Sequence, residues 1–466
     1  MVGFIQTTTP QKTPLVKTDF RHAICFGETG SGKTSSFILP NIEARMKENY
    51  GLFIIDYKGN LDQQIKVLAK KTKRLDDVVE LGSSWGQKVN ILNGVSKKLF
   101  LETCEILDGD SASKDKFWIN SALNVFDILF DIFSLLKHIK DLTHKEDIPD
   151  DVVYDINVKT FVQITRDESS LRSFHYNLSF VKNFTFDYFV ENKLKYSERT
   201  AHLILSFKEK MEKRLKDLDT FINTIEEDRP AAGGGGVLLV VRNLLLTLSA
   251  DGLNGEDDLI ELLDSGKIVV FKSNSFNNEL TKAVLHILYT RLATRDMGLN
   301  PISLFVDEFQ RSVSKKNIPF VDVFREKKVE LICSVQNLQQ LENHLGESRC
   351  SEFLANIIHQ YSYSNRYEQS LETFEYIHNN TKYKASPIFF EDSKLKKVQY
   401  DWQIINGLEI DFIGKWIYKK SIDSYSAIVV NINTKKERVY YPYVEYAESI
   451  INIYSKNYDD YCDLYE

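Results

Sequence analysis

The sequence predicts an α/β fold with a mainly parallel central sheet and an inserted all-α domain. One observation is a series of apolar runs of strand length, at residues 23–26, 51–56, 267–271, 302–307 and 330–336. Another is the helical stretch between the first two runs, which makes a βαβ unit and so a parallel pair. A third is the helical periodicity and scarcity of glycine from residue 96 to about residue 232.

Composition agrees with a folded chain of several units. With 466 residues, 43% hydrophobic and 12% aromatic, two or three compact units are expected. The 59 basic and 66 acidic residues exclude a surface coated in positive charge but allow basic residues confined to a channel. The five cysteines include no C-x-x-C pair, so neither a zinc site nor a disulfide framework is indicated. The most apolar stretches, 123–136 and 237–250, fall short of the ~20 residues of a membrane span, so no transmembrane helix is expected.

The first functional motif is residues 27–34, which fit the phosphate-loop pattern G-x-x-x-x-G-K-[ST] directly after an apolar run. A strand, a glycine turn and a helix in this order aim backbone N–H groups and a positive helix end at one point. Lys33 is expected to reach the β- and γ-phosphates and Thr34 to ligate Mg²⁺. The predicted nucleotide-binding residues are Gly27, Glu28, Thr29, Gly30, Ser31, Gly32, Lys33, Thr34 and Ser35.

The elements after this loop extend the α/β pattern. Residues 35–42 continue a helix that Pro40 is expected to bend or end. The strand at 51–56 then closes on the polar turn 56–60. This strand-helix-strand order at short spacing indicates a parallel sheet.

Four domain segments are expected along the chain. Residues 1–95 form the first part of a nucleotide-binding domain, and 96–236 an all-α insertion with helices at 117–136 and 203–225. The glycine tract 231–236 is interpreted as the hinge or loop that ends this insertion. Residues 237–395 resume the nucleotide-binding domain, with a weaker strand at 359–364 nearer an edge. Residues 396–466 are a carboxyl-terminal segment of unknown role, with a strand-like run at 426–431.

An apolar strand that ends in two acids supplies the carboxylates a nucleotide hydrolase needs. Asp307 and Glu308 follow the run at 302–306. Asp307 is expected to hold the Mg²⁺ shell together with Thr34, and Glu308 to polarise the attacking water.

Two further residues are candidates for the chemistry. Gln336 ends the next strand, where a polar side chain can sense the γ-phosphate and align water. Arg325 lies between the two strands and is the leading candidate for an arginine finger toward a neighbouring subunit, with Arg291 and Arg295 as alternatives.

With these motifs placed, the chain resembles the conjugative coupling proteins of type IV secretion (VirD4/TraD/TraG) within the FtsK–HerA group of motor ATPases. The likeness covers roughly residues 20–370. Besides the phosphate loop, it rests on Leu-Pro-Asn-Ile at 39–42, Asp-Tyr-Lys-Gly-Asn at 56–60, Val-Asp-Glu-Phe at 306–309, the arginine segment 324–329, and the glutamine segment 334–341. Tyr57 and Asn60 stand where the family motif has proline and glutamate.

The resemblance implies a RecA-like P-loop NTPase fold and an ATP-hydrolysing DNA translocase that uses ATP and Mg²⁺. It also implies a homo-oligomer, namely a hexamer with nucleotide between subunits, and DNA, relaxosome or secretion-channel proteins as partners. Two alternatives remain open. One is a receptor ATPase for protein substrates of a type IV secretion system, and the other a soluble HerA-like ATPase of a DNA-processing or phage-defence complex. The family's amino-terminal membrane anchor is missing from the sequence, so the expected location is the cytoplasm, or the inner membrane through a partner.

Overall fold

The computed structural model divides the chain into two compact units. The sheet unit comprises Met1–Glu80, Ile260–Asn278 and Leu292–Glu466, and the helical unit Leu81–Leu259 and Glu279–Arg291. The structure describes residues 16, 18–27, 29–30, 33–59, 61–82, 86–109, 116–144, 148, 152, 156–192, 196–227, 234–249, 252–273, 278–297, 299–357, 359–362, 374–378, 381–392, 395–404, 413–418, 426–431 and 437–440.

The sheet unit is built on a nine-stranded sheet with the order β13-β12-β7-β1-β6-β5-β2-β4-β3. All neighbours from β7 to β4 run parallel, which confirms the expected parallel sheet. The strands are β1 (Ala23–Phe26), β2 (Gly51–Asp56), β3 (Val78–Leu81), β4 (Ile268–Lys272), β5 (Ile302–Val306), β6 (Val329–Val335), β7 (His359–Ser362), β12 (Ser426–Asn431) and β13 (Glu437–Tyr440).

Strand β7 does not lie at the edge of the sheet. It pairs with β1 on one side and antiparallel with β12 on the other, and β12 pairs with β13. The polar alternation of this strand, which suggested a position nearer an edge, therefore marks the end of the parallel part of the sheet. The antiparallel strands β12 and β13 come from the segment to which the sequence assigned no role.

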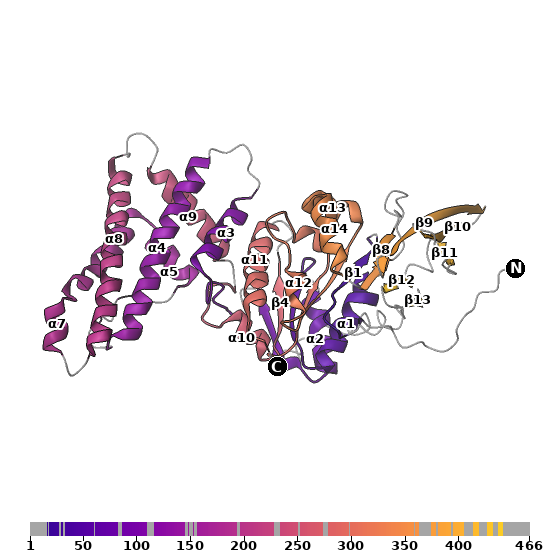
Figure 1. The fold of residues 1–466 in the computed structure, drawn as a ribbon, viewed down its shortest axis with the longest axis horizontal. Coiled ribbons are helices and arrows are strands. Elements are labelled where there is room, and N and C mark those ends of the chain that lie inside the picture. The colour runs from indigo at the N-terminus through magenta and orange to yellow at the C-terminus, as the bar shows by residue number, and fades with distance from the viewer. Residues whose placement is uncertain are drawn as a thin grey trace, which may run out of the picture. The chain divides into compact units, whose positions relative to one another are not determined.

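The buried strands form a core with two helices on one face of the sheet. All residues of β1, β2, β5 and β6 are buried, as expected for strands covered on both faces. Cys25, Ile54, Val270 and Phe305 join one apolar cluster with residues of η1 (Thr34–Ile38), α1 (Leu39–Lys47) and α2 (Leu61–Lys71). Helix α1 and α2 thus cover the face to which these side chains point (Figure 1).

Pro40 neither ends the first helix nor interrupts its packing. The segment from Thr34 to Ile38 has π-helical hydrogen bonding, and α1 begins directly after it with Pro40 in its first turn. Proline lacks an N–H group, and the first turn of a helix is where that donor is dispensable. The change from π to α hydrogen bonding at Leu39 lets the chain pass through Pro40 as one helical segment.

The remaining elements of the sheet unit are short or lie in its carboxyl-terminal part. A separate antiparallel sheet has the order β11-β10-β9-β8. The elements are η2 (Leu75–Asp77), α10 (Leu259–Asp264), η5 (Phe309–Arg311), α12 (Val321–Phe324), α13 (Leu338–Leu345), α14 (Glu347–Ala355), β8 (Phe374–His378), β9 (Thr381–Asp392), β10 (Leu395–Ile404) and β11 (Ile413–Tyr418).

The helical unit packs around aromatic side chains. Phe100 stacks on Phe130 and Phe161 with ring centroids 5.6 and 5.5 Å apart, and Phe133 stacks on Phe174 at 5.5 Å. The long helices α4 and α8 pack against each other (Figure 1). The helices are α3 (Lys97–Asp108), α4 (Lys116–Leu142), α5 (Val158–Ile164), α6 (Glu168–Asn177), η4 (Leu178–Asn183), α7 (Phe186–Glu191), α8 (Glu198–Glu227), α9 (Gly234–Leu248) and most of α11 (Asn278–Thr294).

The helical unit continues beyond the boundary expected at residue 236. Residues 234–248 form α9, which packs on α4 and α5, and the unit extends to Leu259. The glycines at 234–236 therefore begin a helix instead of closing the insertion. A Cβ atom on Gly236 would lie 2.6 Å from the Trp118 ring, so glycine lets α9 approach α4 closely at this point.

Helix α4 is longer than the apolar stretch that the sequence singles out. Its residues Phe117–Leu142 are long and apolar enough to cross a membrane, with an 18-residue window of mean hydropathy 1.5. Half of that window is buried within the protein. Two acids of α4, Asp127 and Asp131, each pair with Lys97 of α3 and with Arg214 of α8. The N···O distance to Asp127 is 2.8 Å from Lys97 and 3.0 Å from Arg214. The packing is that of the central helix of the unit.

Candidate nucleotide site

The predicted site residues other than Arg325 gather at the carboxyl edge of the parallel strands. Strand β6 lies between β1 and β5, and β2 lies on the other side of β5. The turns that follow these strands therefore meet at one edge, where parallel α/β sheets bind ligands. This order brings together the described residues of the phosphate loop, residues 56–59, Asp307, Glu308 and Gln336.

The phosphate loop follows β1 as expected. The Gly27 N–H donates to the Val335 carbonyl at 3.1 Å, which fixes the start of the loop against β6. Gly30 has φ +82°, a conformation that a side chain would strain. Thr29 and Gly30 are exposed. Of the predicted binding residues, Glu28, Ser31, Gly32 and the side chain of Ser35 lie outside the described part of the chain.

Lys33 is buried and folded back onto its own loop. Its side-chain amine donates to the Gly27 carbonyl, and only 7% of the residue is exposed. Burial lowers the pKa of the Lys33 amine, and the Asp307 carboxylate opposes this effect. A phosphate group would offer this ammonium a far stronger acceptor than a carbonyl.

Asp307 and Thr34 form the part of the site that fits a magnesium ion. The Thr34 hydroxyl donates to Asp307 Oδ2 at 2.6 Å, and the Ser334 hydroxyl donates to Asp307 Oδ1. Burial would raise the pKa of Asp307, but Lys58, the two hydroxyl donors and Lys33 lower it, so the carboxylate is ionised. A hydroxyl and a carboxylate oxygen are the hard donors that Mg²⁺ takes alongside phosphate oxygens, so the residues present fit this ion.

Glu308 occupies a constrained position next to Asp307. Its backbone is left-handed at φ 57° and ψ 45°, an uncommon conformation for this residue type that accumulates at functional sites. Its N–H group contacts Asp307 Oδ1 at 3.2 Å. Its side-chain Oε2 pairs with Arg311 Nε at 2.7 Å, so the carboxylate is oriented by a cation on the same turn.

Lys58 lies against the two acids of the site, although the sequence did not single it out. Asp56 accepts hydrogen bonds from the N–H groups of Lys58 at 2.9 Å and Gly59 at 2.8 Å, which shapes the turn after β2. This turn places Lys58 Nζ 3.4 Å from Asp307 Oδ2 and 3.6 Å from Glu308 Oε1. The available signal was its place in the 56–60 motif; Asn60 lies outside the described residues.

The remaining candidates separate into two groups. Gln336 directly follows β6 at the same edge as Lys33 and Asp307, and its Oε1 accepts from the Gln340 amide at 3.3 Å. Arg325 is exposed and precedes β6, so it lies at the opposite edge of the sheet, where it acts electrostatically on His22 ahead of β1. The structure does not bring Arg325 to the site of its own chain, and its role toward a neighbouring subunit stays a prediction.

The two alternative arginines are held by acids within their own units. Arg291 makes two hydrogen bonds to Asp258, each of 2.9 Å. Arg295 pairs with Asp264 at 2.7 Å and is 6% exposed. Both arrangements hold the guanidinium groups in structural ion pairs.

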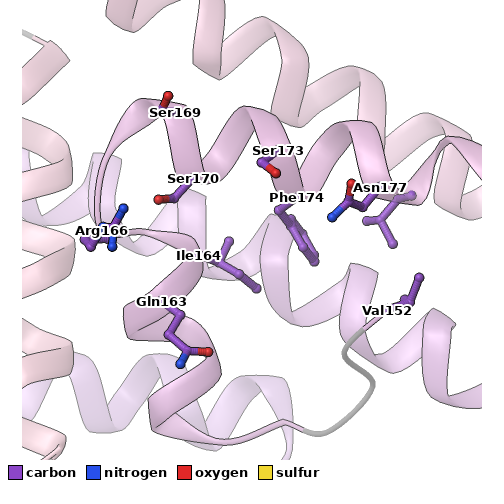
Figure 2. A pocket seen from close by; sticks show the side chains of 10 residues that line it. Val152, Gln163, Ile164, Arg166, Ser169, Ser170, Ser173, Phe174 and Asn177 are labelled. Carbon is purple, nitrogen blue, oxygen red and sulfur yellow. The ribbon is translucent and has the colours of Figure 1, made fainter. Parts of the chain in front are cut away.

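The helical unit contains a separate pocket of about 430 Å³ (Figure 2). Its floor is apolar, with Ile164, Phe174 and Leu178, and serines of α6 line one side. Arg166 at its rim pairs with Asp167 at 3.0 Å. This pocket contains none of the residues that the sequence predicts for nucleotide binding.

Comparison with known proteins connects the site to a family. Residues 6–212 match the model of the family described as type IV secretory system conjugative DNA transfer. No curated protein sequence matches the chain.

Solved structures share the fold at low sequence identity. The plasmid coupling protein TrwB in complex with the non-hydrolysable ATP analogue ADPNP has a TM-score of 0.51 at 13% identity, covering 94% of this chain and 91% of that one. TrwB in complex with ADP and Mg²⁺ has a TM-score of 0.50 at 12% identity, with coverages of 93% and 89%. The unbound bacterial conjugative coupling protein TrwBdeltaN70 has a TM-score of 0.50 at 10% identity, with coverages of 94% and 90%.

The family match and the structural matches agree with the phosphate loop and with the parallel sheet. The structures confirm the RecA-like P-loop fold, and the family model covers the phosphate loop, the 56–60 turn and much of the helical unit. Residues 6–212 thus resemble the conjugative DNA transfer family, and the described part of the chain has the fold of the solved coupling-protein structures.

Proposed function

We propose that the protein is an ATP-hydrolysing DNA translocase of the conjugative coupling type. The observation that carries this proposal is the direct contact of Thr34 with Asp307, beside Lys33 and Glu308. It joins the phosphate loop to the acidic strand end across 273 residues of sequence. ATP and Mg²⁺ are the ligands this set fits, and TrwB is known in complex with an ATP analogue and with ADP and Mg²⁺.

We propose one step for each side chain. Lys33 leaves the Gly27 carbonyl and neutralises the β- and γ-phosphates as charge develops on them. Glu308, oriented by Arg311, accepts the proton of the attacking water. Thr34 and Asp307 would hold Mg²⁺, which supplies Lewis-acid polarisation of the phosphoryl oxygens. Gln336, at the same edge, is placed to align the water.

The match to the conjugative DNA transfer family supports DNA as the cargo. A hexamer is proposed from the resemblance to coupling proteins; in it, Arg325, at the opposite sheet edge of its own chain, would act as a finger on another subunit's nucleotide. Relaxosome or secretion-channel proteins are proposed as further partners. The proposed location is the cytoplasm, or the inner membrane through such a partner.

The deciding experiment measures ATPase activity with and without single- and double-stranded DNA, together with the mass of the assembly. We expect DNA-stimulated hydrolysis and an ATP-dependent hexamer. Lys33→Ala should abolish hydrolysis, because the phosphates lose their main cation; full activity in this variant would refute the assignment of the loop. Hydrolysis stimulated by secreted proteins and not by DNA would instead favour a receptor for protein substrates.

A further inference from the structure

We propose that Lys58 is a catalytic residue that changes partners during each ATPase cycle. Without nucleotide its ammonium pairs with Asp307 and Glu308, and with ATP bound it contacts the γ-phosphate. The inference rests on the proposed function, because it needs an ATP-binding site. The turn after β2, which carries Lys58, would then distinguish ATP from ADP.

The backbone of Lys58 is fixed, while its side chain is free to move. Asp56 holds the turn through the N–H groups of Lys58 and Gly59 and through that of Leu61 at 2.9 Å. The Lys58 side chain is 50% exposed, unlike the two acids it contacts, which are 9% and 12% exposed. A flexible four-carbon stem on a rigid turn is suited to swing between two nearby acceptors.

One carboxylate oxygen explains why the partners would change. Asp307 Oδ2 accepts from the Thr34 hydroxyl at 2.6 Å and also faces Lys58 Nζ at 3.4 Å. This oxygen belongs to the pair of donors that fits Mg²⁺. A divalent ion held there would compete with Lys58 for the same oxygen, so Lys58 would lose one of its two acceptors when MgATP binds and keep only Glu308.

The nearest new acceptor is then the terminal phosphate. Thr34 ends the phosphate loop and contacts Asp307, and phosphate oxygens bound there carry more negative charge than any side chain at the site. Only ATP places a γ-phosphate at this position, so the new contact is absent with ADP. A hydrogen bond between charged groups of this kind corresponds to about a tenfold or larger change in affinity.

Arg311 provides an internal comparison. It contacts Glu308 through Oε2, whereas Lys58 faces Oε1 of the same carboxylate. Arg311 therefore orients the general base, while Lys58 alone of these two cations also faces Asp307. Replacement of Arg311 should therefore slow hydrolysis without altering the preference for ATP over ADP.

The test compares the affinities of Mg²⁺-ADPNP and Mg²⁺-ADP in the full chain by displacement of a fluorescent nucleotide. The variants are Lys58→Met, Lys58→Arg and Arg311→Met. The control is Lys47→Met, which removes a lysine of similar exposure that pairs with Glu43 on α1 at 2.7 Å. In Lys58→Met we expect the ADPNP-to-ADP affinity ratio to fall about tenfold or more with ADP affinity retained. Lys58→Arg should recover part of the ratio, and the other two variants should keep it.

Three results would overturn the inference. An unchanged ratio in Lys58→Met would show that Lys58 does not contact the γ-phosphate. An equal loss of ADPNP and ADP affinity would show a general role in holding the site. A wild-type chain that binds neither nucleotide would refute the proposed function itself, so the two failures can be told apart.

Discussion

His22 has its protonation state set by two hydrogen bonds in the core of the sheet unit. Its Nδ1 accepts from the Leu331 N–H at 3.1 Å, so Nε2 carries the proton donated to the Val321 carbonyl at 2.7 Å. Burial lowers the pKa of His22 to about 4; the Val321 carbonyl and Asp19 oppose this, and His359 and Arg325 add to it. The folded protein therefore requires the neutral ring.

His22 should make the protein less stable as the pH falls. Because the folded pKa of about 4 lies below the unfolded value of 6.5, the unfolded chain binds the extra proton between these values. The contribution is complete above pH 6.5 and lost toward pH 4, in total about 3 kcal/mol. Urea unfolding of wild type and His22→Gln across this window measures it. Equal pH slopes in both proteins would exclude the effect.

Glu308→Gln should separate nucleotide binding from hydrolysis. The amide keeps the shape of the side chain but cannot accept the proton of water, so kcat should fall about 10²- to 10⁴-fold while ATP stays bound. Turnover assays and retention of labelled ATP after gel filtration check this. Glu326→Gln, an exposed neighbour in the same unit, serves as control. Normal turnover in Glu308→Gln would remove Glu308 from its catalytic role.

The helix after the phosphate loop is tied to the sheet by a buried ion pair. Arg45 of α1 donates to both oxygens of Glu330 on β6, at 2.5 and 3.0 Å, and Ser303 of β5 donates to the same carboxylate. Both charged side chains are 1% exposed. A buried pair with satisfied hydrogen bonds specifies how α1 sits on the strands.

Breaking this pair should be costly. Arg45→Met leaves the Glu330 charge buried without its cation and should lower the free energy of unfolding by about 3–5 kcal/mol. Lys47→Met on the same helix removes an exposed lysine from Glu43, which keeps its ion pair with Lys71 at 3.0 Å, and should cost under about 1 kcal/mol. Denaturant unfolding measures both, and the double variant Arg45→Met/Glu330→Met should lose less than the sum. A loss in Arg45→Met no larger than in Lys47→Met would refute the coupling.

The elements that the sequence predicted well are those whose pattern is unambiguous. Parallel strands buried on both faces are continuous apolar runs, and β1, β2, β4, β5 and β6 appear within one residue of their predicted positions. Helix α9 was missed because the glycine tract before it was interpreted as the end of the insertion. The last of these glycines instead begin the helix, which packs on α4.

At the scale of the whole molecule, each unit has its own core. The sheet unit is built on β1, β2, β5 and β6 with α1 and α2, and the helical unit on the phenylalanines around Phe100. A domain with its own core can lose stability while another stays folded.

Phe100→Ala should loosen the helical unit selectively. Phe100 is fully buried among Phe126, Phe130 and Phe161, so its loss should cost about 3–5 kcal/mol. Hydrogen exchange should rise in α3, α4 and α5 while β1, β5 and β6 keep their protection. Phe117→Ala, at 59% exposure on α4, is the matched control and should change little. Equal exchange increases in both units would show that they unfold as one.

The sequence by itself determined the phosphate loop, the acidic strand end, the parallel sheet and the helical insertion, because each is written in a local pattern of glycine, charge or apolar period. Only the tertiary structure placed Lys58 against Asp307 across 249 residues, added Ser334 to that carboxylate, and put Arg325 at the opposite edge. The physical reason is strand order. The arrangement β1-β6-β5-β2 decides which turns meet, and it results from how the whole chain buries its apolar strands, which no single segment records.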